Sequence, residues 1–169
     1  MEDPLIDKVN EQDEVTGTIR QSLVYKNKAN FRVVHILIFS PEGKLLLQRL
    51  RPNHERYPGY WGSSAAGHVH HTESYVDAAK RILKSNLGIH HPALIPLGKL
   101  PMTDHGVTKF LTAFQCTWDQ PVQLDPLEVG GLDFVSMQGP GKIVLEDRRT
   151  FTPTFRRVMI EFKPFMKAK

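Results

Sequence analysis

The sequence predicts an α+β sandwich built as one domain. Two of the observations behind this prediction are a pair of apolar strand segments between residues 32 and 50 and an amphipathic helix over residues 75–87. A third is that strand and helix signals follow one another without regular βαβ alternation, which argues against a doubly wound parallel sheet. The length of 169 residues is enough for a single domain with a sizeable core.

The strongest strand signal is the run RVVHILIFS at residues 32–40, which is rich in β-branched and aromatic residues. It stops at residues 41–43 and resumes as KLLLQRL at residues 44–50, so we expect a hairpin of two buried strands. The next segment, RPNHERYPGYWG, has the prolines, glycines and charges of a loop, and SSAAGHV after it is small and extended. Further strands are expected at residues 94–100, 109–118 and 132–135.

The helix at residues 75–87 is predicted by apolar side chains that recur at spacings of three and four residues. Ser74 and Asp77 form a capping pair at its start. Gly88 supplies the left-handed residue that ends it. The apolar positions are Tyr75, Val76, Ala79, Ile82, Leu83 and Leu87.

A second helix is expected near the C-terminus. Thr152 is a favourable N-cap and Pro153 suits the first helical position, so the helix is expected to begin there and to extend through Phe162. The single domain, 1–169, then divides into an N-terminal arm at about 1–30, a core at about 31–136 and a C-terminal helical part at about 137–169.

Charge and cysteine content narrow the function classes. The 22 Lys plus Arg residues against 18 Asp plus Glu residues suit an anionic small molecule, but they fall short of the dense basic stripe of nucleic-acid binders. The single cysteine, Cys116, lies in an apolar run, which favours a buried thiol and a reducing compartment. The N-terminal stretch lacks an apolar segment and no run is long enough to span a bilayer, so we expect a cytoplasmic protein without membrane contact.

The stretch from Gly67 to Ile89 has a characteristic spacing. Five residues separate Gly67 from Glu73, seven separate Glu73 from Arg81, and Gly88 and Ile89 close the stretch. This frame resembles the Nudix box. The segments VNEQDEVTG, FRVVHILIFSPEGKLLLQR, PGYWGSSAAGHV and FTPTF resemble the Nudix subgroup related to isopentenyl-diphosphate isomerase. The resemblance covers residues 9–155 and implies a Nudix-type α/β/α sandwich with a mixed β-sheet.

The resemblance also implies a metal site, because in Nudix hydrolases glutamates on the box helix bind Mg²⁺ or Mn²⁺, which clamps a diphosphate and activates water. Three of these positions, spaced i, i+3 and i+4, hold Ile82, Ser85 and Asn86 in this sequence. Ile82 ligates no metal, and the other two offer only neutral oxygens. Lys80 and Lys84 make the helix more positive, so no Mg²⁺ site is expected at residues 82, 85 and 86.

Other residues of the implied site are kept. Glu73 and Glu128 are the candidate catalytic carboxylates, and Glu128 matches a position where some Nudix enzymes keep an acidic base. Arg81 matches the arginine that orients the box glutamates, and it is also a candidate substrate-binding residue. An exposed loop acid explains Glu128 equally well, and the resemblance places Glu73 near the turn from loop to helix, where its usual role is a supporting or secondary one at the metal.

Arginines around the expected pocket are candidates for holding phosphate, because guanidinium groups bind phosphate as bidentate donors. Arg49 and Arg51 are the substrate-binding candidates in this group, and Arg56 follows them in the same loop. All three fit solvent-facing positions equally well.

The histidines offer a different ligand set. His68 and His70 occupy alternate positions of an extended segment, so both rings would face one side and, with Glu73, could hold a transition ion such as Zn²⁺. Surface or hydrogen-bonded histidines are the simpler interpretation. His68, a further substrate-binding candidate, matches a metal-ligating histidine of the related isomerases. Their partner histidine and catalytic cysteine are replaced here by Phe31 and Ala66, so isomerase activity is the less favoured alternative.

Two functions from different classes remain. The first is a Nudix-fold protein that binds a small diphosphate ligand, either a nucleoside diphosphate derivative or a prenyl diphosphate, with impaired or absent hydrolysis. The second is an active Nudix pyrophosphohydrolase that recruits Mg²⁺ or Mn²⁺ through Glu73, Glu128 and the histidines. Nothing in the sequence names the ligand, and the oligomeric state, including a homodimer, stays open.

Overall fold

The computed structural model of the protein describes residues 2–136 and 147–162. The strands are β1 (Leu5–Val9), β2 (Val15–Arg20), β3 (Phe31–Phe39), β4 (Leu45–Arg49), β5 (Trp61–Gly62), β6 (Ala65–His68), β7 (Ile95–Asp104), β8 (Val107–Thr117) and β9 (Gly131–Val135). The α-helices are α1 (Tyr75–Leu87) and α3 (Pro153–Glu161), and a short 3-10 helix, η1 (Gln21–Leu23), follows β2.

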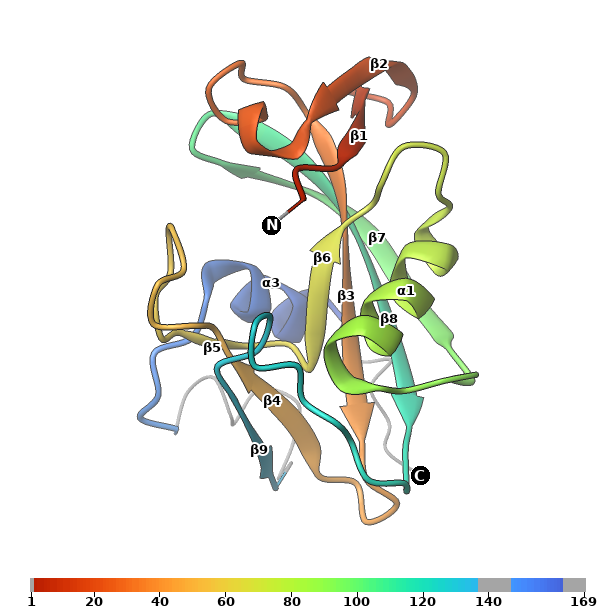
Figure 1. The fold of residues 1–169 in the computed structure, drawn as a ribbon, viewed down its shortest axis with the longest axis vertical. Helices are drawn as coiled ribbons and strands as arrows, with labels where there is room; N and C mark the ends of the chain where they lie inside the picture. The colour runs from red at the N-terminus through yellow and green to blue at the C-terminus, as the bar shows by residue number, and fades with distance from the viewer. Residues whose placement is uncertain (1, 137–146, 163–169) are drawn as a thin grey trace.

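A mixed seven-stranded sheet forms the centre of the molecule. Its strand order is β5-β4-β3-β8-β7, with β6 also paired to β3 and β9 to β4. Helix α1 packs on one face of this sheet and α3 on the other, while β1 and β2 form a separate two-stranded sheet at one end (Figure 1). The predicted α+β sandwich with a mixed sheet is therefore confirmed.

Strand β3 is the centre of the large sheet. Its nine residues are buried except for Arg32, and it runs parallel to β8 over its whole length. Along its other edge, residues 33–36 pair with β6 in the antiparallel direction. A strand enclosed by partners and by helices is apolar on both faces, which explains why this segment gave the strongest strand signal.

The hairpin predicted for β3 and β4 is confirmed at its turn, but the two strands do not pair along their length. β3 and β4 pair only at Phe39 and Leu45, after which β4 pairs with β5 and β9. β4 cannot follow β3 further because β6 and β8 occupy the two edges of that strand. The segment predicted as a loop before residue 63 also ends in the short strand β5. The strands predicted at residues 94–100, 109–118 and 132–135 are confirmed as β7, β8 and β9.

Both predicted helices are confirmed together with their caps. At the start of α1 the backbone N–H of Asp77 donates to Ser74 Oγ at 3.0 Å, and at its end Gly88 has a φ of 64°. At the start of α3 the backbone N–H of Phe155 donates to Thr152 Oγ1 at 3.2 Å. Of the C-terminal part predicted at 137–169, only residues 147–162 are described.

The alternation of side chains along β3 separates the core into two layers. Val33, Leu37 and other odd-numbered residues pack with α3, while Val34 and Ile36 pack with α1. His35 shares the odd positions and therefore lies on the α3 side, where it is buried. The two faces of the sheet thus have different chemistry: the α1 layer is formed by apolar side chains, whereas the α3 layer includes polar groups.

The sequence predicts a buried thiol at Cys116 and no segment that spans a membrane. Cys116 is buried, and its burial raises the pKa of the thiol to about 11, so the prediction of a core thiol is confirmed. In the parts of the chain that the structure describes, no helix is long and apolar enough to cross a membrane.

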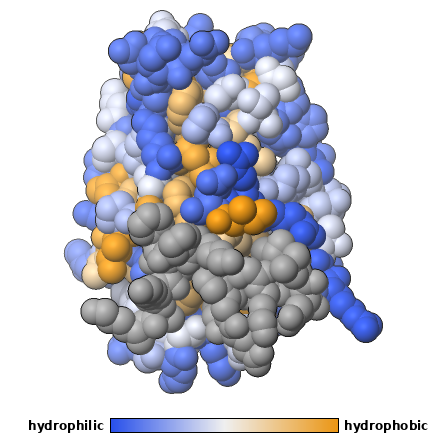
Figure 2. Space-filling view, turned by 180° about the vertical axis from the view of Figure 1, so that it is seen from behind, coloured by the Kyte–Doolittle hydropathy of each residue, from blue (hydrophilic) through white to orange (hydrophobic). Residues whose placement is uncertain are grey.

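The β1–β2 sheet is joined to the large sheet through Asp13, in the turn between its strands. Most of the surface at this end of the molecule is hydrophilic (Figure 2), yet Asp13 itself is buried. Its side chain accepts from Arg32 Nε at 2.7 Å and from Tyr75 Oη at 2.9 Å, and it forms an ion pair with Lys99. One carboxylate therefore connects the turn to β3, α1 and β7.

The carboxylate is held in its charged form. Burial raises the pKa of Asp13, but the hydrogen bonds from Lys99, Arg32 and Tyr75 outweigh it and leave the pKa below its usual value of 3.8. The residue also has a φ of 61°, a left-handed conformation that Asp and Asn tolerate better than other side chains.

The variant Asp13→Asn is expected to lower the free energy of unfolding at pH 7 by about 1–3 kcal/mol, because it leaves the half-buried Arg32 and the exposed Lys99 without their shared countercharge. Asn fits the same backbone conformation, so the change isolates the charge. Because the native pKa lies below the unfolded one, this stability is present above about pH 4 and is lost at lower pH.

Urea unfolding at pH 7 and pH 3 measures the effect, with Glu14→Gln in the same turn as the matched control. Glu14 is exposed, so its variant is expected to change stability by less than about 0.5 kcal/mol. Equal stabilities of Asp13→Asn and the control at pH 7 would contradict the role of Asp13.

Candidate functional site

The segment between β6 and α1 brings together four of the residues singled out in the sequence. Arg81 donates from Nε to Glu73 Oε2 at 2.7 Å and from Nη2 to Glu73 Oε1 at 3.0 Å. The same Nη2 donates to the carbonyl oxygen of His68 at 2.8 Å, and the backbone N–H of His70 donates to Glu73 Oε1 at 2.7 Å. These hydrogen bonds of Glu73 and Arg81 therefore hold the loop before α1 in one conformation.

The bonds to Glu73 bear on its chemistry. Burial raises the pKa of its carboxyl, but the Arg81 guanidinium and the His70 N–H outweigh this and hold the pKa below its usual range. The group is thus a charged carboxylate with both oxygens already accepting hydrogen bonds. Such a carboxylate is suited to positioning the loop and poorly suited to taking a proton from water.

Ile82 lies where the helix comes closest to the sheet. Only 3% of its surface is exposed, and it belongs to the apolar layer between α1 and the sheet. A Cβ atom on Gly67 would lie 2.7 Å from Ile82 Cδ1, closer than a real methyl group can approach. Glycine at this position of β6 therefore makes room for the isoleucine.

The two polar residues on the same helix face are bonded to each other. Ser85 Oγ donates to Asn86 Oδ1 at 3.1 Å, and the carbonyl oxygen of Asn86 accepts from the backbone N–H of Asp125 at 2.9 Å. Asn86 is 8% exposed and Ser85 is exposed. With Ile82 beside them, these residues present no charged oxygen to a cation.

Mg²⁺ and Mn²⁺ do not fit this set of residues, because hard divalent ions bind mainly through carboxylates, carbonyl oxygens and water. Across residues 2–136 and 147–162, no group of three or more His, Cys, Asp and Glu side chains is placed to hold a metal ion. His70 Nδ1 lies 3.9 Å from Glu73 Oε1, but His68 is turned to stack on Phe31, with ring centroids 5.1 Å apart.

The remaining sequence candidates lie in loops or at the end of a strand. Glu128 is exposed, and its backbone N–H donates to the carbonyl oxygen of Asp125 at 3.0 Å. Arg49 is exposed at the end of β4, where its Nε donates to the carbonyl oxygen of Gly59 at 3.4 Å. Arg51 is half-buried at the start of the loop.

A second group of polar side chains lies on the α3 side of the sheet, and only two of its members were singled out in the sequence. Lys109 projects from β8 and is 7% exposed. Its Nζ donates to Thr154 Oγ1 at 2.7 Å and lies 3.9 Å from Asp104 Oδ2. We call this group the Lys109 cluster; its members are Tyr25, Arg56, His68, Asp104 and Lys109.

The members of the Lys109 cluster come from separate segments. Arg56 lies over the ring of Tyr25, with its guanidinium carbon 3.9 Å from the ring centroid. Three of the cluster's buried polar atoms have no hydrogen-bond partner among the described residues: Arg56 Nη1, Tyr25 Oη and Asp104 Oδ2. Buried polar atoms are usually paired, so these groups have unused capacity to bind a ligand or water.

Burial shifts the titration of the groups in this layer. It lowers the pKa of Lys109 to about 8, with Asp104 opposing the shift and Arg56 adding to it. Burial also lowers the pKa of His68 to about 3, helped by Arg56 and Lys109. His35, whose Nδ1 lies 2.8 Å from Ser63 Oγ, is likewise shifted to about 3 by burial. At neutral pH both histidines are uncharged, and Lys109 is mostly protonated.

Sequence reasoning missed Lys109 because a lysine at a strand end is usually exposed. A signal was present: in VTKFLTAF, Lys109 has the same parity as Leu111 and Ala113, which face the core.

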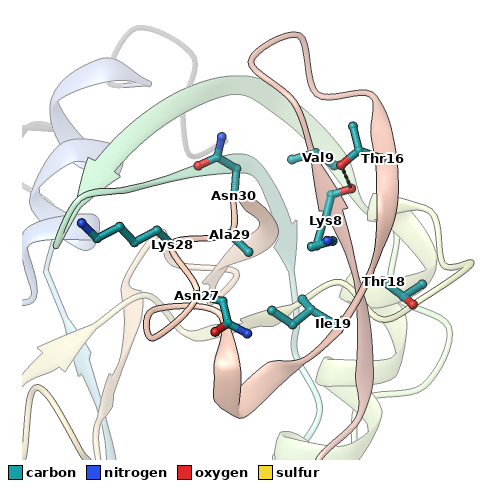
Figure 3. Close-up of a pocket in the computed structure, with 9 residues that line it drawn as sticks. All are labelled: Lys8, Val9, Thr16, Thr18, Ile19, Asn27, Lys28, Ala29 and Asn30. Carbon is teal, nitrogen blue, oxygen red and sulfur yellow. Dashed lines mark hydrogen bonds between the residues drawn. The ribbon is translucent and has the colours of Figure 1, made fainter.

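A separate hollow of about 550 Å³ lies between the β1–β2 sheet and the segment that leads into β3. It is lined by Lys8, Val9, Thr16, Thr18, Ile19, Asn27, Lys28, Ala29 and Asn30. Figure 3 shows the side chain of Lys28 extending away from Lys8, so the two ammonium groups do not converge on one point. None of the sequence candidates lines this hollow.

The fold and this arrangement define a class of protein. The family model of the NUDIX domain matches residues 29–155, and the chain belongs to the Nudix family. An uncharacterized Nudix hydrolase of Pseudomonas aeruginosa is 30% identical over 146 residues, which cover 86% of this chain and 84% of that protein. The isopentenyl-diphosphate Delta-isomerase of Halorhodospira halophila is 29% identical over 137 residues, or 75% of each chain.

Solved structures agree on the fold. The crystal structure of a Deinococcus radiodurans protein superimposes with a TM-score of 0.79 at 20% identity, covering 94% of this chain and 98% of that one. The Nudix domain of Shewanella oneidensis NrtR, solved in complex with ADP-ribose, gives a TM-score of 0.66 at 16% identity, with 88% and 100% covered.

The contact between Gly67 and Ile82 can be tested by a double-mutant cycle. Gly67→Ala is expected to cost about 1–3 kcal/mol of stability, because the added methyl group overlaps Ile82 Cδ1. Ile82→Val removes that atom and costs about 0.5–1.5 kcal/mol alone. The double variant should be more stable than the sum of the two losses predicts, as measured by urea unfolding. Strictly additive losses would mean that Ile82 does not limit the space at Gly67.

The variant Lys109→Met is expected to raise the free energy of unfolding at pH 7 by about 2–3 kcal/mol. A native pKa of about 8 against the usual 10.5 means that the buried ammonium destabilises the native state, by about 1.4 kcal/mol per pKa unit. The lost hydrogen bond to Thr154 offsets about 1 kcal/mol of this gain.

The pH dependence has a definite sign. Between pH 8 and 10.5 the native state of the wild type binds fewer protons than the unfolded chain, so the wild type gains stability and the difference from Lys109→Met shrinks. Urea unfolding at pH 7 and pH 10 measures both values. A variant that is less stable than the wild type at pH 7 would contradict the strain assigned to Lys109.

Proposed function

We propose that this Nudix protein binds a small diphosphate-containing ligand and has impaired or absent metal-dependent hydrolysis. The observation that carries the proposal is the buried Ile82 at a helix position where the family resemblance implies a metal-binding glutamate. Because this side chain is part of the core, no water or metal takes its place without repacking α1 on the sheet.

Charge supports the same proposal. A set of three carboxylates would bring three negative charges to this face, whereas Ile82, Ser85 and Asn86 bring none. Lys80 and Lys84 are exposed on the same helix and raise the local potential. Exposed lysines repel a cation only weakly through water, so the missing carboxylates are the larger effect that disfavours a divalent ion here.

A structural neighbour supports the choice of ligand class. The Nudix domain of Shewanella oneidensis NrtR was solved with ADP-ribose, which is a diphosphate diester. We therefore propose a nucleoside diphosphate derivative as the first class and a prenyl diphosphate as the second. Arg49 is the last residue of β4, and Arg51 lies at the start of the loop that follows. Both are proposed to contact the phosphates. Arg81 is assigned to positioning Glu73 instead, because its Nε and Nη2 already donate to Glu73 and to the carbonyl oxygen of His68.

The alternative function is a hydrolase with a non-standard metal site at Glu73, Glu128, His68 and His70. The contact between His70 and Glu73 favours it to a limited extent, since these two groups are close enough to share an ion after a small movement. Against it, Glu73 is bonded to Arg81 and His68 is stacked on Phe31. Isomerase chemistry is less favoured, because Ala66 has no thiol to serve as the catalytic group.

Location and assembly remain proposals as well. We propose a cytoplasmic protein on the basis of its single buried cysteine. A homodimer is compatible with the sequence, and nucleic acid is not expected as a partner.

The experiment is thermal unfolding with ADP-ribose, ADP or isopentenyl diphosphate, each in EDTA and in Mg²⁺ or Mn²⁺. A ligand at about 100 times its Kd should stabilise the protein by about 2.7 kcal/mol, which is a rise in Tm of roughly 5–10 °C. We expect the same rise with EDTA as with metal, and no hydrolysis of the ligand. A rise that requires metal, with turnover, would support the hydrolase instead.

The matched variant is Ile82→Glu/Ser85→Glu/Asn86→Glu, which places three carboxylates on the helix face. Glutamate is a good helix former, but an unpaired carboxylate at the buried position 82 costs about 1–3 kcal/mol. The folded variant is expected to bind Mn²⁺ and to gain measurable hydrolysis of at least one diphosphate. A variant that binds Mn²⁺ but stays inert would place the defect in the pocket rather than in the helix.

A further inference from the structure

We infer that Lys109 and Arg56 form a phosphate-binding subsite on the α3 face of the sheet, separate from the box helix on the α1 face. For the identity of the whole ligand this inference rests on the proposed function. The subsite takes one phosphate group of that ligand, in addition to the contacts proposed for Arg49 and Arg51, through direct contacts with protein donors and without a metal ion.

The Lys109 cluster carries more positive than negative charge. Lys109 and Arg56 are opposed by Asp104 alone, and Asp104 Oδ1 is already 2.6 Å from Nδ1 of His105. The distance of 3.9 Å between Lys109 Nζ and Asp104 Oδ2 is too long for a hydrogen bond. An ammonium group that is nine-tenths buried and lacks a close anion is destabilising, and a bound phosphate would remove that penalty.

Unused hydrogen-bonding atoms point to the same ligand. Lys109 Nζ has three donors, and one of them is directed to Thr154 Oγ1. Arg56 Nη1 and Tyr25 Oη are buried and unpartnered among the described residues, and both can donate to phosphate oxygens. Asp104 Oδ2 is an unpartnered acceptor, which suits a protonated phosphate oxygen or a sugar hydroxyl.

The donors are held in place before a ligand binds. The guanidinium of Arg56 rests on the ring of Tyr25, and that ring packs edge-on against Phe31 with centroids 5.7 Å apart. His68 stacks on the same Phe31 at 5.1 Å. This packing restricts the Arg56 side chain, so binding loses less conformational entropy than it would with a mobile arginine.

The cluster reaches the surface at one end. Lys109 lies at the inner end, whereas Arg56, Tyr25 and Asp104 are half-buried. His105, in the turn between β7 and β8, has a side chain that is 57% exposed and lies 6.0 Å from the ring of Tyr25. The solvent-exposed side of the cluster is therefore formed by this turn and by the loop that carries Arg56, and the inference takes this side as the approach for the phosphate.

The test is calorimetric titration with inorganic pyrophosphate and with ADP-ribose, both in EDTA, on the wild type and on the single variants Lys109→Met and Arg56→Met. Lys84→Met is the matched control, because Lys84 is an exposed lysine on α1, on the opposite face of the sheet. We expect each cluster variant to weaken binding of both ligands at least tenfold and the control to leave it unchanged. Circular dichroism and the expected higher stability of Lys109→Met exclude unfolding as the cause.

The outcomes separate the two proposals. If the wild type binds ADP-ribose and both cluster variants bind it equally well, the subsite is wrong and the proposed function stands. If pyrophosphate binding depends on Lys109 and Arg56 but no diphosphate ester binds, the subsite is right and the proposed function fails. If the wild type binds neither ligand, both are wrong, and water satisfies the unpartnered atoms.

Discussion

The close approach of α1 to β6 at Gly67 is the constraint on which the rest of the site depends. Ile82 occupies the space that a side chain at position 67 would need, and this contact fixes the helix on the sheet. Once the helix is fixed, the loop before it is tied by Glu73 and Arg81. The same contact places hydrocarbon at a position where the family resemblance implies a metal-binding glutamate, which is the basis of the proposal that hydrolysis is impaired.

The two faces of the sheet have different roles as a result. The α1 face is closed by apolar packing, whereas the α3 face contains the buried Lys109 and the half-buried Arg56. A buried cation without a close anion lowers the stability of the native state, and destabilising groups of this kind are typical of ligand-binding sites. In a Nudix hydrolase a metal ion neutralises the diphosphate, while here protein cations would have to do so. The proposed function therefore keeps binding of the diphosphate and omits the activation of water.

The sequence predicted the local structure well where periodicity or capping determines it. The helix at Tyr75–Leu87 follows from its apolar spacing and its caps, and β3 follows from its continuous apolar run. The partners of β3 could not be predicted, because pairing with β6 and β8 depends on segments far away in the chain. The Lys109 cluster was missed for the same reason: its members become neighbours only when separate strands and loops pack together. A lysine within an apolar strand pattern was the one local clue.

The central claim is that this Nudix protein holds a diphosphate ligand without cleaving it. A single-turnover incubation, with the protein in excess over radiolabelled ADP-ribose and with Mn²⁺ present, tests it most directly, because slow product release cannot hide chemistry under these conditions. The account predicts that ADP-ribose is bound at equilibrium, is released intact on denaturation, and is bound equally well in EDTA. Cleavage to AMP and ribose phosphate within seconds, abolished by EDTA, would contradict it.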